Sequence, residues 1–204
     1  MKIVCLGSSS VEGIGDRKGI GWAGRLNQYL QENSKINEYR VFNLGLKGDF
    51  LSGTISRYKT EVLKRRPHLV IIFTGSNDCV THIKDGNAIK QPNIDVYTKQ
   101  WDSFLTDLSQ AEHKTLILGP TMVNESVMNY KGVDVTFKNS DLEEYNKALK
   151  DLCAQHKIQF LELFDLFNGK LEELSFDFVH PNEKGYDLIF KRLITELEEN
   201  NYVW

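Results

Sequence analysis

The sequence predicts an α/β protein in which a five-stranded parallel sheet lies between two layers of helices. Apolar runs of strand length alternate with segments of helical period along the 204 residues. Residues 69–74 are almost continuously apolar, as expected of a strand that is covered on both faces. No repeat or linker interrupts the alternation. Strands that alternate with helices form parallel sheets, so we expect residues 1–204 to form a single domain.

The expected strands are apolar runs that end at turn residues: residues 2–7, 39–44, 69–74, 115–118 and 158–164. The expected helices repeat their apolar residues at helical spacing: residues 22–30, 51–62, 94–111, 140–156 and 181–197. Ser140 and Glu143 fit a capping box, which predicts that the fourth helix begins there. Residues 121–139 have no clear period, and segments of that length in compact domains are often functional.

Composition excludes several classes of protein. The net charge is −3 with dispersed Lys and Arg, so the basic footprint of a nucleic-acid binder is missing. The three cysteines lack the spacing of a zinc site or a disulfide framework. No apolar run is long enough to span a membrane and no leader precedes the first strand. We therefore expect a cytoplasmic protein without membrane insertion, unless a leader was removed. The oligomeric state stays open.

Four polar segments follow the carboxyl ends of the first, second, third and fifth strands, the edge where open α/β sheets bind ligands. They are residues 7–9, 43–49, 75–78 and 177–182. Together they hold a hydroxyl, a glycine-rich backbone, a side-chain amide and a carboxylate–imidazole pair. These are the groups that acyl transfer requires: a nucleophile, a base, a group that orients the base, and oxyanion donors.

Each of these residues also has a structural interpretation. Ser9 could cap the helix after the first strand, Gly48 could be a turn glycine, and Asn77 could form an Asx turn. Asp177 and His180 could be surface residues before a helix. A carboxylate three residues before a histidine can accept the Nδ1 proton, however, and leave Nε2 as the acceptor that a general base needs.

In their order and spacing the four segments resemble the SGNH hydrolases, also called GDSL-type esterases and lipases. The resemblance covers nearly the whole chain and implies a flavodoxin-like α/β/α fold. Gly-x-Ser-x-x-x-Gly implies that Ser9 is the nucleophile, and Asp-x-x-His-Pro-Asn implies that Asp177 and His180 complete a triad. Asn-x-Gly-x-x-Gly-Asp and Gly-x-Asn-Asp imply an oxyanion hole formed by the N–H groups of Ser9 and Gly48 and the amide of Asn77.

One position departs from the family pattern, which usually has Gly-Asp-Ser in the first segment. Here Ser8 replaces the aspartate. That residue braces the loop in the family and is not a signature catalytic residue, and a serine still forms local hydrogen bonds. The replacement bears on loop rigidity and substrate preference. Asp78, which follows the amide donor, is expected to have a structural role.

The resemblance implies a serine esterase that acts on a small-molecule ester through an acyl-enzyme, without metal or organic cofactor. His180 should then reach Ser9 Oγ within about 3 Å, with Asp177 at its other ring nitrogen. The alternative is a non-catalytic binding protein on the same scaffold that recognises an acylated sugar or a nucleotide. The altered first segment favours this alternative, and the intact Ser9, Asn77, Asp177 and His180 oppose it.

Residues 121–139 follow the fourth strand at the same edge and should form one wall of the substrate pocket. Their candidate substrate-binding side chains are Met122, Met128, Tyr130 and Phe137. Methionine and aromatic side chains suit an adaptable surface for an acyl or sugar group. The alternative is that these side chains pack on the core as part of a short helix or hairpin.

Overall fold

The computed structural model describes residues 1–34, 39–84, 87–90, 93–125 and 135–203. Its main sheet is parallel, with the strand order β2-β1-β3-β6-β8. The strands are β1 (Lys2–Gly7), β2 (Arg40–Gly45), β3 (Leu69–Phe73), β6 (Lys114–Leu118) and β8 (Gln159–Leu161). Numbered along the parallel sheet alone, this order is 2-1-3-4-5, that of the flavodoxin-like fold. The predicted fold class is confirmed.

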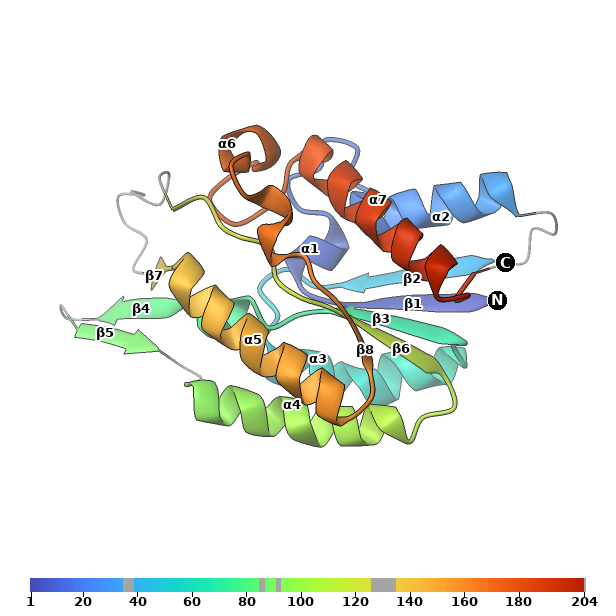
Figure 1. Cartoon of the computed structure of the whole chain (residues 1–204), viewed down its shortest axis with the longest axis horizontal. Coiled ribbons are helices and arrows are strands. Elements are labelled where there is room, and N and C mark those ends of the chain that lie inside the picture. The colour runs from blue at the N-terminus through green and yellow to red at the C-terminus, as the bar shows by residue number, and fades with distance from the viewer. Residues whose placement is uncertain (35–38, 85–86, 91–92, 126–134, 204) are drawn as a thin grey trace.

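Helices cover both faces of this sheet (Figure 1). One face carries α2 (Gly21–Asn33) and α7 (Glu183–Glu199), which pack on each other. The other carries α3 (Leu51–Arg57), α4 (Ile94–Ser109) and α5 (Asn139–Gln155). The expected capping box is wrong, because α5 begins at Asn139 and its N-cap position is Lys138, two residues before Ser140, with no side-chain cap hydrogen bond.

Two apolar cores lie between the layers, because side chains alternate across a strand. Ile3 and Cys5 of β1 face the core under α2 and α7, whereas Val4 and Leu6 face the core under α3, α4 and α5. All five residues of β3 are buried, which explains its continuous apolar run. The buried side chains of the central strands therefore hold the sheet between the two helical layers, and the polar segments follow at the carboxyl ends of the strands.

Several short elements connect the layers. They are α1 (Ser9–Glu12), the 3₁₀ turns Asn77–Cys79 and Phe164–Phe167, and α6 (Leu171–Leu174). The segment expected to form one α-helix over residues 51–62 contains two types of helix. It is α-helical only in α3, continues as a π-helix over Tyr58–Val62, and is followed by a 3₁₀ turn over Leu63–Arg65. Within the described ranges, every helix is too short or too polar to cross a membrane.

A second, antiparallel sheet was not predicted. It has the order β5-β4-β7 and consists of β4 (Thr81–Lys84), β5 (Asn87–Lys90) and β7 (Val135–Thr136). Figure 1 shows it beside the main sheet on the side away from the chain termini, near the carboxyl ends of the parallel strands. Because β7 lies within residues 121–139, part of that segment has regular structure.

Candidate active site

Ser9 lies at the end of β1, where the chain turns sharply into α1. The turn requires glycine at position 7, since a Cβ there would lie 2.0 Å from the Phe73 carbonyl oxygen of β3. Ser8 occupies the N-cap position, and its carbonyl accepts from the Val11 N–H while its side chain forms no cap hydrogen bond. The first residue of a helix has an N–H without an intrahelical partner. Ser9 therefore presents both a hydroxyl and a backbone donor at the carboxyl edge.

His180 brings an imidazole to this hydroxyl from a segment 171 residues away. Its Nε2 lies 2.9 Å from Ser9 Oγ, and its Nδ1 lies 2.8 Å from Asp177 Oδ2. The other carboxylate oxygen, Oδ1, accepts from the backbone N–H groups of Val179 and His180 at 2.8 and 2.7 Å. The distance from His180 to Ser9 and the place of Asp177 at the other ring nitrogen agree with the expectation from the sequence.

The ionisation of Asp177 sets the tautomer of the histidine. Burial alone would raise the pKa of the Asp177 carboxyl, but hydrogen bonds from the His180 ring and from two backbone N–H groups outweigh it. The net result is a pKa below its ordinary value. An ionised carboxylate beside Nδ1 favours the tautomer in which Nε2 can accept from the Ser9 hydroxyl.

The loop that carries Asp177 and His180 is held at its base. Phe176 N–H donates to the His180 carbonyl at 2.8 Å. Asn182 caps α7 by accepting from the N–H groups of Lys184 and Gly185, so the helix begins at Glu183, two residues after its expected start at residue 181. These contacts fix the imidazole with respect to the sheet rather than leaving it on a free surface loop.

The candidate oxyanion donors lie on two neighbouring loops. Gly48 lies between β2 and α3 with φ of +77°, and no atom lies within 4 Å of where its Cβ would be. Asn77 follows β3, and its side-chain amide donates to the Asp49 carbonyl at 2.8 Å. Leu46 N–H donates to the Gly7 carbonyl at 3.0 Å, which ties the same loop to the end of β1. The two candidate donor residues are therefore linked through the residue after Gly48.

Asp78 has a structural contact, as expected. Its buried carboxylate accepts from the Leu51 N–H at 2.9 Å, at the start of α3. Burial raises the pKa of Asp78 to about 6; the Leu51 hydrogen bond opposes this rise, and the nearby Asp49 carboxylate adds to it.

Residues that the sequence did not point to also contact this edge. Glu12 Oε2 accepts from the Lys47 N–H at 2.6 Å, and Arg57 bonds to Asp49 and to two strand-end carbonyls. Leu46 and Phe176 are apolar yet 51% and 63% exposed, one on each of two segments that flank Ser9 and His180. The helical spacing of apolar residues predicted that Arg57 lies on a helix, but nothing in the sequence indicated its contacts with Asp49 and the strand-end carbonyls.

The expected substrate wall is partly described. Met122 is half-buried, whereas Phe137 is buried and its ring centroid lies 6.0 Å from that of Phe178 in the Asp177–His180 loop. Asn124 N–H donates to the Phe178 carbonyl at 2.8 Å. Residues 121–125 thus contact the loop that carries the imidazole. Met128 and Tyr130 lie outside the described residues.

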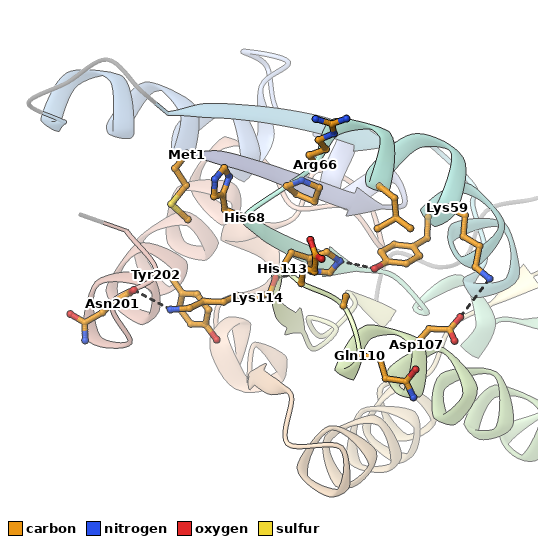
Figure 2. Close-up of a pocket in the computed structure, with 15 residues that line it drawn as sticks. Met1, Lys59, Arg66, His68, Asp107, Gln110, His113, Lys114, Asn201 and Tyr202 are labelled. Atoms are coloured by element: carbon orange, nitrogen blue, oxygen red, sulfur yellow. Dashed lines mark hydrogen bonds and ion pairs between the residues drawn. The ribbon is translucent and has the colours of Figure 1, made fainter.

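A cavity of about 1050 Å³ lies at the opposite, amino edge of the sheet (Figure 2). Its wall includes Tyr58 and His113, whose hydroxyl and Nε2 are 2.6 Å apart. Burial lowers the pKa of His113 and raises the pKa of Tyr58 to about 12, so both groups are neutral and satisfy each other. Cationic Lys59 and anionic Asp107 line the same walls. This cavity is separate from the Ser9–His180 pair, and its charges select no single kind of ligand.

No group of three or more His, Cys, Asp or Glu side chains within the described ranges could hold a metal ion. A model of the GDSL-like lipase/acylhydrolase family matches residues 5–188, which is most of the chain and includes all four polar segments.

The chain belongs to the GDSL-like lipase/acylhydrolase family.

Relatives of this GDSL-like protein are distant in sequence but match this chain over most of their length. The chain is 22% identical to the uncharacterized protein YpmR of Bacillus subtilis, covering 97% of this chain and 81% of YpmR. It is 24% identical to an acetylxylan esterase of Geobacillus stearothermophilus, covering 91% and 84%. The crystal structure of Axe2, an acetylxylan esterase from the same organism, matches with a TM-score of 0.77 at 19% identity, covering 96% and 93%. The structural match supports the fold, and membership of the family makes this chain a hydrolase acting on ester bonds.

Proposed function

We propose that residues 1–204 form a single-domain serine esterase that cleaves a small-molecule carboxylic ester through an acyl-enzyme. The observation that carries the proposal is the continuous hydrogen-bonded chain from Asp177 through His180 to Ser9 Oγ. A nucleophile, a base within reach of it and a group that orients the base are the arrangement that nucleophilic catalysis needs. No metal or organic cofactor enters this mechanism.

In the first half-reaction, Ser9 Oγ attacks the acyl carbon while His180 Nε2 takes the hydroxyl proton. Asp177 holds the ring and stabilises the imidazolium that forms. The carbonyl oxygen becomes an oxyanion, and the N–H groups of Ser9 and Gly48 and the Asn77 amide donate to it. When the bond between the acyl carbon and the alcohol oxygen breaks, His180 gives its proton to the leaving alcohol. Water then attacks the acyl-enzyme through the same base and regenerates Ser9.

For the substrate, we infer that acetylated carbohydrates are the first class to test, since the relatives include acetylxylan esterases. The acyl or sugar group would lie against residues 121–139. Met122 would contact it directly, and the buried Phe137 would act through Phe178, on which it packs. Met128 and Tyr130 complete the proposed wall.

The second candidate is a non-catalytic binding protein for an acylated sugar or a nucleotide. The observation that favours it is Ser8, which stands where the family usually has aspartate and makes no cap hydrogen bond through its side chain. The short contacts between Ser9, His180 and Asp177 favour the enzyme, because binding alone does not need an activated hydroxyl.

Rapid mixing with p-nitrophenyl acetate separates the two candidates. An esterase that accumulates an acyl-enzyme releases a burst of nitrophenol close to one equivalent per protein, and mass spectrometry places the acetyl group on Ser9. The Ser9→Ala variant should lose the burst, and the neighbouring Ser10→Ala variant should keep it. A wild-type protein without turnover whose Ser9→Ala variant binds acetylated sugar unchanged would establish the binding protein instead.

A further inference from the structure

Arg57 makes four hydrogen bonds at the carboxyl edge of the sheet although it belongs to no signature segment. Its Nε and Nη2 donate to Asp49 Oδ2 at 3.1 and 2.6 Å. Nη1 donates to the Leu44 carbonyl and Nη2 also donates to the Gly7 carbonyl, both at 3.0 Å. The side chain is only 15% exposed, and the Asp49 side chain 9%. Partial burial lowers the local dielectric and strengthens such contacts.

These partners belong to the two strand ends and the loop that form the candidate oxyanion hole. Gly7 is the last residue of β1, two positions before Ser9, and Leu44 lies in β2. Asp49 directly follows Gly48. One planar guanidinium therefore connects the strand that ends at the nucleophile to the loop that holds a candidate oxyanion donor. A guanidinium is suited to this because its donors have a fixed, fork-like geometry.

Few contacts fix the Gly48 peptide group: the Asp49 N–H donates to the Leu46 carbonyl at 3.1 Å and closes the turn that contains Gly48. Gly48 is exposed, its φ is +77°, and no atom lies within 4 Å on its Cβ side. Its orientation depends on its chain neighbours. On one side, Glu12 Oε2 accepts from the Lys47 N–H; on the other, Arg57 binds the Asp49 carboxylate and Asn77 binds the Asp49 carbonyl.

Without Arg57, the Asp49 carboxylate would be a largely buried charge close to another carboxylate. The nearby Asp49 carboxylate also contributes to the rise in the pKa of Asp78. Thr54 Oγ1 donates to Asp49 Oδ2 at 3.2 Å but carries no charge. Loss of the guanidinium would therefore favour movement of Asp49 toward solvent, and the Gly48 peptide would move with it.

We propose that Arg57 is a positioning residue that orients the Gly48 N–H toward the oxyanion by binding Asp49, Gly7 and Leu44 together. This inference rests on the proposed esterase function. Arg57 does not touch the substrate, so its effect should fall on the transition state, in which the oxyanion is formed, and not on the ground state. A small misplacement of such a group lowers rates by about 10- to 100-fold.

The test compares Arg57→Gln and Arg57→Lys with the wild type on p-nitrophenyl acetate. Arg57→Gln should lower kcat by about 10- to 100-fold with KM within about twofold, because the lost interaction serves only the transition state. The inhibition constant of a boronic acid, which forms a tetrahedral adduct with serine, should rise by the same factor. Arg57→Lys keeps the charge but loses the fork, so it should recover only part of kcat.

Arg192→Gln is the matched control, since it removes another ion pair, Arg192–Glu196 at 3.2 Å, on α7 and outside the four polar segments. It should lower Tm without changing kcat. If Arg57→Gln does not fold, the inference is tested with Arg57→Lys and Asp49→Asn, whose kcat and KM are compared with those of the wild type in the same way. Folded Arg57 variants with wild-type kcat, or with equal losses in kcat and substrate affinity, would overturn the inference. Retention of activity by Ser9→Ala would instead refute the proposed function itself.

Discussion

The side-chain amide of Asn77 donates to the backbone carbonyl of Asp49 over 2.8 Å. This bond joins the loop after β3 to the loop after β2. An amide nitrogen has two N–H groups, so one is engaged in holding Asp49 and the second is the candidate oxyanion donor. The same side chain would then both position the Gly48 loop and stabilise the transition state.

Asn77→Ala should therefore lower kcat by about 10²- to 10³-fold, the usual loss for one oxyanion donor. Steady-state kinetics on an activated acetate ester measure this loss, and circular dichroism checks that the fold is kept. Ser76→Ala, one residue earlier, is the control and should retain the wild-type rate. An Asn77→Ala variant with wild-type kcat would remove Asn77 from the oxyanion hole.

Asp78 should make the stability of the protein depend on pH. Its pKa is raised from 3.8 to about 6 in the folded state, so the folded protein holds a proton that the unfolded chain releases between these values. Its contribution to stability is fully present below pH 3.8 and is lost as pH rises to about 6. The shift corresponds to at most about 3 kcal/mol.

Thermal unfolding of Asp78→Asn checks this prediction. The asparagine oxygen can still accept from the Leu51 N–H but does not titrate. The Tm of the wild type relative to Asp78→Asn should therefore be higher at pH 4 than at pH 7. A Tm difference that is constant over this range would mean that the carboxyl is not the titrating group.

Met122→Ala should shift acyl-chain preference, measured as kcat/KM on esters of increasing chain length, because Met122 begins the proposed substrate wall. Phe137→Ala is expected mainly to lower stability, by about 3–5 kcal/mol, since its ring is buried against Phe178. Ile158→Ala, just before β8, is the control for a loss of packing away from this edge. Unchanged preference in a folded Met122→Ala variant would place the specificity wall elsewhere.

Leu46 and Phe176 should contribute to substrate binding. Both are largely exposed, so Leu46→Ala and Phe176→Ala should leave Tm almost unchanged. If they contact the acyl or alcohol group, KM should rise severalfold for apolar esters while kcat on acetate esters stays close to that of the wild type. Val96→Ala, which is similarly exposed on α4, should change neither. If the KM values of all three variants equal that of the wild type, Leu46 and Phe176 have no role in substrate binding.

The sequence alone determined the parallel strands, their helices and the four polar segments. It could do so because these features are local: apolar period predicts each element, and parallel strands bring their carboxyl ends to one edge. Ser9 and His180 could therefore be expected at the same edge, and the family resemblance implied their contact. Asp177 lies only three residues from His180, so its contact with the ring was also a local inference.

Tertiary structure alone decided the features that depend on pairing across the chain. Strand β4 pairs with β7 about fifty residues later, and such short strands have too little period to be recognised. Helical spacing placed Arg57 on α3, but only the folded chain brings its guanidinium to Gly7, Leu44 and Asp49. Burial of Phe137 against Phe178 likewise follows from how two distant loops pack. Local pattern specifies elements, whereas the contacts of long side chains depend on where those elements finally lie.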